Sequence, residues 1–236
     1  MIILRERRCR AELMDQPDLD AKAHAGALRG LERLNRWSGV LRILWPPVSR
    51  QFQKNRGRPL RLLDIASGAG DLPSMLWCKA RRAGHSLDVE GWDISTHAVE
   101  YALRRARERG SEVKFTQVDA LAAEPDTKFD IVVASLFLHH LSPELAIELL
   151  RRMRSWAGSL VLVNDLRRST AGLILAHVAT RVLCASSVVR TDGPRSVEGA
   201  FTCREVKELA ECAGMAEASV QPRWPFRLLL SWERRQ

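Results

Sequence analysis

The chain of 236 residues has one tyrosine, six lysines and no closely spaced pair of cysteines. Its tyrosine, Tyr101, is followed at the fourth position by Arg105, so the Tyr-x-x-x-Lys pair expected of a nicotinamide-dependent reductase is absent. The cysteines form no Cys-x-x-Cys motif and no cluster with histidine, so we expect no metal site and no disulfide framework. They lie far apart, at Cys9, Cys78, Cys184, Cys203 and Cys212.

The sequence also predicts neither a membrane-spanning segment nor a signal peptide. The longest apolar region, residues 173–189, contains His177 and Arg181, which makes it a poor candidate to cross a bilayer. The arginines near the start of the chain are not followed by an apolar core, so no signal peptide is expected. Reduced thiols then fit a cytoplasmic location.

The charge balance is strongly basic, with a formal net charge of +9 and a pI of about 9.9. Such a balance suits nucleic acid or another acidic surface. However, arginine outnumbers lysine 31 to 6, and the arginines are scattered rather than massed. We therefore do not favour a nucleic-acid partner, and the oligomeric state stays open.

The stretch 60–73 reads LRLLDIASGAGDLP and organises the rest of the chain. Its first six residues form an apolar run typical of a strand buried on both faces of a parallel sheet. The small residues of 66–70 then predict a turn at which the backbone can approach a ligand closely. Asp71 and Pro73 suit the start of a helix. Strand, turn and helix together predict the first crossover of a nucleotide-binding α/β sheet.

After this stretch, strands and helices alternate, which indicates a parallel sheet. We expect strands at 60–65, 87–92, 113–118, 129–134, 159–163, 216–221 and 226–232. We expect helices at 72–83, 96–109, 143–156, 171–185 and 203–212, and a basic loop at 189–198 that could act as a lid. We expect residues 1–58 to form an N-terminal helical cap and linker, and residues 59–236 to form the main domain. In the cap, a helix starts at 17–20, and a second one stops at Pro46-Pro47 before a linker at 51–59.

The turn is not the G-x-G-x-x-G fingerprint of dinucleotide-binding folds, because Pro73 stands where the third glycine belongs. It resembles motif I of the class I S-adenosylmethionine methyltransferases, with Asp64, Ala66, Gly68 and Gly70 in the motif places and Ser67 between them. Ala66 stands where that family usually has its first glycine. The resemblance implies S-adenosylmethionine as cofactor. It also implies a Rossmann-like, seven-stranded, mostly parallel sheet with helices on both faces, here with an N-terminal helical cap and an insert after the fifth strand.

Further cofactor contacts are expected where the next strands end. Asp93 lies 93 − 70 = 23 residues after Gly70, close to the spacing of about 20 at which an acid binds ribose hydroxyls in dinucleotide folds. Its neighbour Ile94 is assigned to the same site. The resemblance places Asp119 at the adenine amino group and the backbone N–H of Ala120 at a ring nitrogen. It also places Asp64 near the amino-acid end of the cofactor.

Acceptor chemistry is expected at the exits of the fourth and fifth strands, with Ser135 at the boundary between cofactor and acceptor. His139 and His140 are adjacent, so we expect their side chains to diverge and at most one to face the cleft. A histidine can accept a phenol proton near neutral pH, and we rank His140 first. Asp165 is a rival base or an acceptor contact. Packed or capping roles remain alternatives for both histidines.

The segments 12–20 and 192–197 resemble a bacterial subgroup related to quinone-biosynthesis methyltransferases, whose members often accompany type III polyketide synthases. The favoured function is methyl transfer to a hydroxyl of a small, apolar aromatic or polyketide-derived acceptor. Alternatives are C-methylation of a quinol ring and a non-catalytic or RNA-binding protein of the same fold. Apolar residues of the cap and of the 171–198 insert are expected either to cover the acceptor or to form core: Leu41, Ile43, Leu44, Trp45, Leu173, Ile174, Leu175 and Val178.

Overall fold

A computed structural model describes residues 4, 6–16, 20–56 and 58–235. Within them, seven strands form one sheet in the order β3-β2-β1-β4-β5-β7-β6. The first five pair in parallel, and β7 runs antiparallel between β5 and β6, so the expected mostly parallel sheet is confirmed. The strands are β1 (Leu60–Ile65), β2 (Leu87–Asp93), β3 (Lys114–Gln117), β4 (Phe129–Ser135), β5 (Ala157–Leu166), β6 (Ser219–Arg223) and β7 (Arg227–Glu233).

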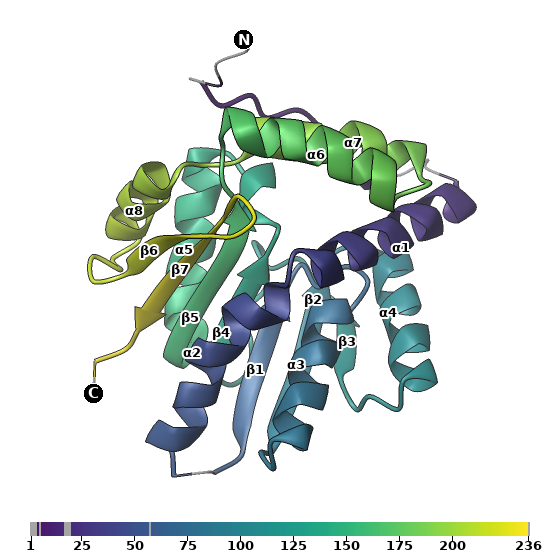
Figure 1. Ribbon diagram of the computed structural model, residues 1–236. Helices are drawn as coiled ribbons and strands as arrows, with labels where there is room; N and C mark the ends of the chain where they lie inside the picture. The colour runs from purple at the N-terminus through teal and green to yellow at the C-terminus, as the bar shows by residue number, and fades with distance from the viewer. Residues whose placement is uncertain (1–3, 5, 17–19, 57, 236) are drawn as a thin grey trace.

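Helices cover both faces of the sheet (Figure 1). One face is covered by α2 (Val40–Lys54), α3 (Asp71–Arg82) and α4 (Thr96–Glu108), and the other by α5 (Pro143–Trp156) and α8 (Cys203–Cys212). Each face buries its own apolar cluster, which explains why the central strands read as continuous apolar runs.

Three further helices lie together beyond the edge of the sheet, where the strands β1, β4 and β5 end (Figure 1). They are α1 (Ala21–Trp37), α6 (Thr170–Leu183) and α7 (Ser187–Gly199). Ala27 of α1 packs with Val188, Val189 and the buried thiol of Cys184. The expected insert after the fifth strand is therefore present, and it packs on the N-terminal helix.

The expected end of the second helix at Pro46-Pro47 is wrong, because α2 continues through both prolines to Lys54. Pro47, Val48 and Phe52 are buried against the sheet, and this packing outweighs the backbone hydrogen bonds that the prolines cannot make. Part of the expected linker at 51–59 is thus helical. The predicted helix start at 17–19 lies outside the described residues, whereas Asp20 caps α1 by accepting the N–H groups of Lys22 and Ala23.

The expected basic loop at 189–198 is also wrong, because these residues belong to α7 with Pro194 inside the helix. Asp-Gly-Pro commonly marks a turn, but here Asp192 is buried and serves another purpose. Its carboxylate accepts the backbone N–H groups of Leu13 (2.9 Å) and Met14 (3.1 Å) from the N-terminal segment. Tertiary contacts therefore set the local structure of residues 189–198. The predicted division of the chain into a cap (1–58) and a main domain (59–236) stays a prediction. Among the described residues, none of the helices is long and apolar enough to cross a membrane.

The position of Phe52 predicts that α2 belongs to the core of the sheet. We expect Phe52→Ala to lower the free energy of unfolding by about 3–5 kcal/mol, because a fully buried aromatic side chain would leave a cavity. Gln53→Ala, at the exposed neighbouring position, should change it by less than about 0.5 kcal/mol. Chemical denaturation measures both, and equal effects would show that α2 is not part of the folded core.

Candidate active site

The turn after β1 is held by the second strand. Ser67 donates its backbone N–H to the carbonyl of Trp92 (2.9 Å), and Gly68 donates its N–H to Oδ2 of Asp93 (2.8 Å). The other carboxylate oxygen of Asp93 accepts the N–H of Ser95 (2.9 Å), at the start of α4. Asp93 therefore fixes the turn after β1 and connects it to the start of α4.

Two glycines in this turn have left-handed backbone conformations for different reasons. At Gly70 (φ +68°) an added Cβ would lie 2.5 Å from the ring of Phe115, so the close packing of α3 on the sheet requires glycine. At Gly68 (φ +51°) an added Cβ would meet nothing within 4 Å. The backbone at Gly68 thus faces open space, as a turn that receives a ligand should. Ala66 is also left-handed (φ +53°), at the position where the resembled motif usually has glycine.

Asp64 lies beneath this turn and is buried, with no hydrogen-bond partner at its Oδ1. Burial, and then the neighbouring carboxylates of Asp71 and Asp93, raise the pKa of Asp64 well above its usual value. A buried carboxyl group without a partner is costly, so a cationic group of a ligand would be stabilised here.

The remaining predicted cofactor residues lie along the same edge of the sheet. Ile94 is 66% exposed, so its side chain is available for contact with a flat ring. Asp119 is exposed, and its carboxylate accepts the N–H of Leu121 (2.9 Å), while Ala120 is buried behind it. Ser135 ends β4, and its hydroxyl accepts the side-chain N–H of Asn164 (2.8 Å). These positions agree with a common site, and the individual contacts stay predictions.

At the ends of β4 and β5 the structure pairs Asp165 with His139 rather than with His140. Nδ1 of His139 lies 2.7 Å from Oδ1 of Asp165, and the backbone N–H of His139 donates to Oδ2 (3.1 Å). Oδ1 also accepts the N–H of Leu166 (2.6 Å). Asp165 therefore holds both the ring and the backbone of His139, and it also accepts the backbone N–H of Leu166.

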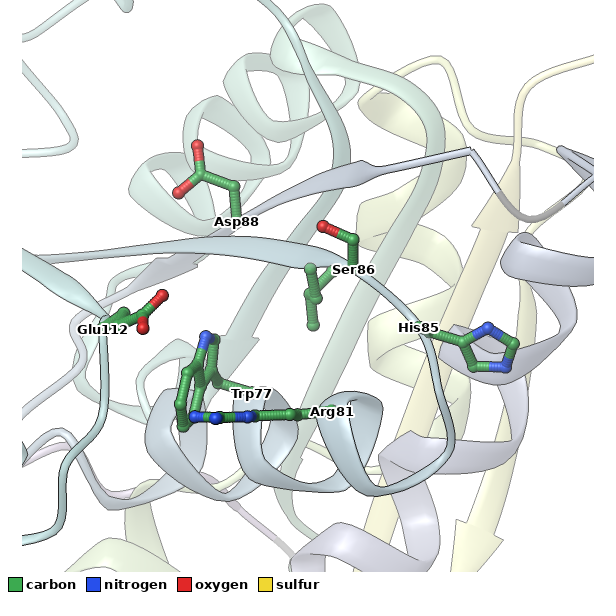
Figure 2. A pocket seen from close by; sticks show the side chains of 7 residues that line it. Trp77, Arg81, His85, Ser86, Asp88 and Glu112 are labelled. Carbon is green, nitrogen blue, oxygen red and sulfur yellow. The ribbon is translucent and has the colours of Figure 1, made fainter.

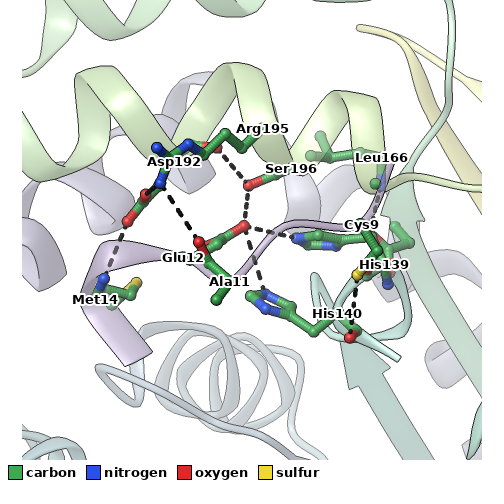
Figure 3. Close-up of polar contacts among 12 residues, drawn as sticks. Cys9, Ala11, Glu12, Met14, His139, His140, Leu166, Asp192, Arg195 and Ser196 are labelled. Atoms are coloured by element: carbon green, nitrogen blue, oxygen red, sulfur yellow. Dashed lines mark hydrogen bonds and ion pairs between the residues drawn. The ribbon is translucent and has the colours of Figure 1, made fainter. Parts of the chain in front are cut away.

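The expectation that adjacent histidine side chains diverge is wrong. His139 and His140 lie in a short 3-10 turn, Leu138–His140, and their ring centroids are only 4.3 Å apart. Both rings present Nε2 to the same carboxylate oxygen, Oε1 of Glu12, at 3.6 Å and 3.9 Å (Figure 3). Glu12 is buried and also accepts a hydrogen bond from the hydroxyl of Ser196.

Opposing effects act on the pKa values of this cluster. Burial alone would lower the pKa of His139, but Asp165 and Glu12 outweigh it and raise the pKa to about 10. Burial would raise the pKa of Glu12, and its contacts with both histidines lower it instead. His139 is thus an imidazolium between two carboxylates near neutral pH. Nothing in the sequence marks Glu12 as a partner of the histidines, since the two segments are distant along the chain.

The N-terminal segment 7–16 reaches this cluster because several contacts hold it there. The guanidinium of Arg7 donates to the carbonyls of Gly199 (2.5 Å), His139 (2.8 Å) and Leu141 (2.6 Å), and it lies over the ring of Phe201 (3.9 Å). Asp192 of α7 then holds the backbone of residues 13 and 14, as described above. The segment therefore brings Glu12 to the strand ends.

Another buried charged residue that the sequence analysis did not single out is Arg227, at the start of β7. Its guanidinium is buried, with Nη2 donating to Ser38 (2.7 Å) and Asn35 (3.2 Å), while Nη1 has no partner. Burial lowers its pKa to about 10, and nearby Asp165 and Asp71 oppose this effect. Asn35 also donates to Asp71 (3.3 Å), so a buried polar network connects α1, α3 and β7.

Two cavities of the structure lie elsewhere and contain none of these residues. One, of about 290 Å³, is lined at the opposite ends of the strands by Trp77, Arg81, His85 and Glu112, among others (Figure 2). The other, of about 330 Å³, lies between α2 and the β6–β7 pair. Neither offers the combination of titratable groups and open backbone found where β1, β4 and β5 end.

Comparison with known proteins agrees with this location. Residues 62–158, which include most of β1, all of β4 and the histidine pair, match the family described as methyltransferase domain. Demethylmenaquinone methyltransferase of Thermus thermophilus is 40% identical over 108 residues, 45% of this chain and 47% of that protein. Ubiquinone biosynthesis O-methyltransferase of Paraburkholderia phytofirmans is 25% identical over 166 residues, 64% of this chain and 69% of that protein. The match to the first relative thus spans about half of its length.

Among solved structures, magnesium protoporphyrin IX methyltransferase from Synechocystis PCC 6803 with bound S-adenosylhomocysteine has a similar fold. The TM-score is 0.57 at 17% identity, and the match covers 92% of this chain and 100% of that one. At this identity the likeness concerns the fold alone, and it confirms the expected sheet with helices on both faces.

The burial of Asp64 predicts a stability cost in the ligand-free protein. Because its folded pKa is raised, the folded state binds more protons than the unfolded state between the two pKa values, and stability falls as pH rises through that window. We expect Asp64→Asn to raise the denaturation midpoint at pH 7 and to flatten its fall between pH 4 and pH 7. Denaturant titration across this range checks it. A variant less stable than the parent at pH 7 would contradict an unpaired carboxyl group.

Proposed function

We propose that the chain is an S-adenosylmethionine-dependent methyltransferase and that it methylates a hydroxyl group of a small, apolar aromatic acceptor. The observation that carries the proposal is the placement of two groups on neighbouring strands. Asp64, whose Oδ1 has no partner, lies near the end of β1 beside the glycine turn, and the His139–Asp165 pair lies where β4 and β5 end. Ligands bind in open α/β sheets at this switch in strand order.

The residues present fit S-adenosylmethionine. Asp64 offers a buried carboxylate oxygen without a partner, suited to the ammonium group of an amino acid, and Arg227 offers a buried N–H without a partner, suited to a carboxylate. Asp71 acts electrostatically on both groups, which supports a common site for them. Asp93, Ile94, Asp119 and Ala120 would hold the nucleoside, with the turn at 66–70 and Ser135 between.

When bound, S-adenosylmethionine supplies a methyl group already activated by its sulfonium. The protein's own contribution is then mainly alignment and exclusion of water. We assign His139 and His140 as the residues that contact the acceptor hydroxyl. Asp165 would orient the ring of His139 through its contact with Nδ1. The carboxylate of Glu12 lies next to the Nε2 atoms of both imidazole rings.

The proposal of an apolar acceptor is supported by exposed apolar residues on α6, and not by those on α2. Ile43 and Leu44 of α2 are buried in the sheet core, so they are not available to an acceptor. On α6, by contrast, Ile174, Val178 and Val182 are spaced four residues apart and remain 54–74% exposed. This apolar stripe, on a helix beyond the strand ends, is our candidate cover for an apolar acceptor.

The alternative, C-methylation of a quinol ring, is favoured by the likeness to demethylmenaquinone methyltransferase, whereas the second relative is named an O-methyltransferase. Both names describe quinone-related aromatic acceptors, which supports the class of acceptor in either case. A non-catalytic or RNA-binding role has only the basic charge in its favour.

The open space at Gly68 predicts an effect on cofactor binding. We expect Gly68→Ala to weaken S-adenosylmethionine binding at least tenfold. The added methyl group would project from the turn into the space where the ligand would lie against the backbone. Gly110→Ala is the matched control, since Gly110 is also left-handed (φ +61°) with nothing within 4 Å. Both variants should lose about 1 kcal/mol of stability. Isothermal calorimetry decides, and equal affinities for the two variants would remove Gly68 from the site.

The acceptor class is tested by incubating the protein with labelled S-adenosylmethionine and alkylresorcinols, quinols, catechols or tRNA. Each added methylene of an alkyl tail should improve binding by ~0.8 kcal/mol until the apolar surface is full. Val178→Ser should reduce this gain, whereas Arg181→Ser, an exposed polar position on the same helix, should not. Mass spectrometry of the product distinguishes O- from C-methylation. A preference for short polar catechols or for tRNA would overturn the proposed acceptor.

A further inference from the structure

The cluster formed by Glu12, His139 and His140 has the geometry of a cation site. One ligand atom from each residue lies within 4.8 Å of the other two. Glu12 Oε1 is 3.6 Å from Nε2 of His139 and 3.9 Å from Nε2 of His140. In a tetrahedral zinc site, metal–ligand bonds of about 2.0–2.2 Å imply ligand separations of roughly 3.4 Å. The two contacts of Glu12 are within about half an ångström of this separation, and the two histidine nitrogens, which lie within 4.8 Å of each other, would also have to approach around an ion.

We propose that Glu12, His139 and His140 bind a divalent transition-metal cation, with zinc favoured by the donor set. Two imidazole nitrogens and one carboxylate oxygen suit zinc better than magnesium or calcium, which prefer oxygen ligands alone. Glu12 and His139 are buried and His140 is partly exposed, so the site is shielded yet reachable from solvent.

The surroundings of the cluster orient its ligands. Asp165 accepts a hydrogen bond from Nδ1 of His139, which turns Nε2 away from Asp165 and toward Glu12 (Figure 3). The cation would displace the proton of Nε2 to solvent, and Nε2 would then bind through its lone pair. A carboxylate behind a ligating histidine fixes its tautomer and raises its basicity, a common arrangement in metal sites. Ser196 donates to Oε1 of Glu12, and the carbonyl of Asp192 accepts a second contact from the Ser196 hydroxyl (2.9 Å).

Three protein ligands leave one tetrahedral position open, as in catalytic rather than structural zinc sites. Resting on the proposed function, the open position would take the acceptor oxygen. The cation would then favour loss of the hydroxyl proton to water and hold the resulting oxyanion for methylation. Metal binding itself does not depend on that function.

The test measures metal binding on the full chain without cofactor or acceptor. Protein stripped with chelator is dialysed against Zn²⁺, and the bound metal is measured by elemental analysis; Co²⁺ is added separately to follow the visible absorption of a four- or five-coordinate site. We expect one ion per chain. Glu12→Gln and His140→Ala should each weaken binding at least 100-fold, and Asp165→Asn by 10–100-fold.

His177→Ala is the control, because His177 is an exposed histidine on α6 away from the cluster. It should leave Zn²⁺ affinity unchanged, and circular dichroism checks that every variant folds. Absence of bound Zn²⁺ and Co²⁺ in the parent protein would overturn the proposal, as would equal losses in the His140 and His177 variants. Bound metal without methylation of any acceptor would instead count against the proposed function and leave the metal site standing.

Discussion

Parallel pairing of β1 with β4, and of β4 with β5, is the constraint on which the candidate site depends. The register places Asp64 beside Val133 and Ser135 beside Asn164, so polar groups from three strands meet at one edge. Both faces of the sheet are covered by apolar clusters, and a slip by one residue would exchange the faces of every side chain in a strand. The packing that stabilises the sheet therefore also fixes the positions of the polar side chains at its edge.

At that edge the protein buries several ionisable groups, some of them with polar atoms that have no partner. Asp64 and Arg227 are buried with unpaired polar atoms, and His139 lies between two carboxylates. Buried groups of this kind are tolerated where a ligand completes their partners, because the free energy of binding offsets their desolvation. Their concentration at the ends of β1, β4, β5 and at the start of β7 distinguishes this edge from the opposite one, where a cavity is lined by solvated side chains.

Local patterns predicted the sheet, its order of elements and most helix boundaries, because apolar runs and capping residues act over a few neighbours. The predicted helix at 203–212, for example, starts where expected, and Thr202 caps it through a capping box with Glu205. The failures have a common cause in distant packing. Pro46 and Pro47 remain helical because α2 is buried, and Asp192 forms no turn because it holds residues 13 and 14. The partnership of Glu12 with two histidines depends on the same long-range docking, which no local pattern could reveal.

The contacts of segment 7–16 also have a consequence for the order of folding. Leu13 and Asp192 are 179 residues apart in the chain, so their contact closes a very long loop for two backbone hydrogen bonds. Such a contact gains free energy only after its docking surface on α7 exists, and contacts of this sequence separation form late. We therefore expect the sheet to be assembled before Glu12 reaches the histidines. During synthesis, segment 7–16 would therefore dock only after residues made much later have folded.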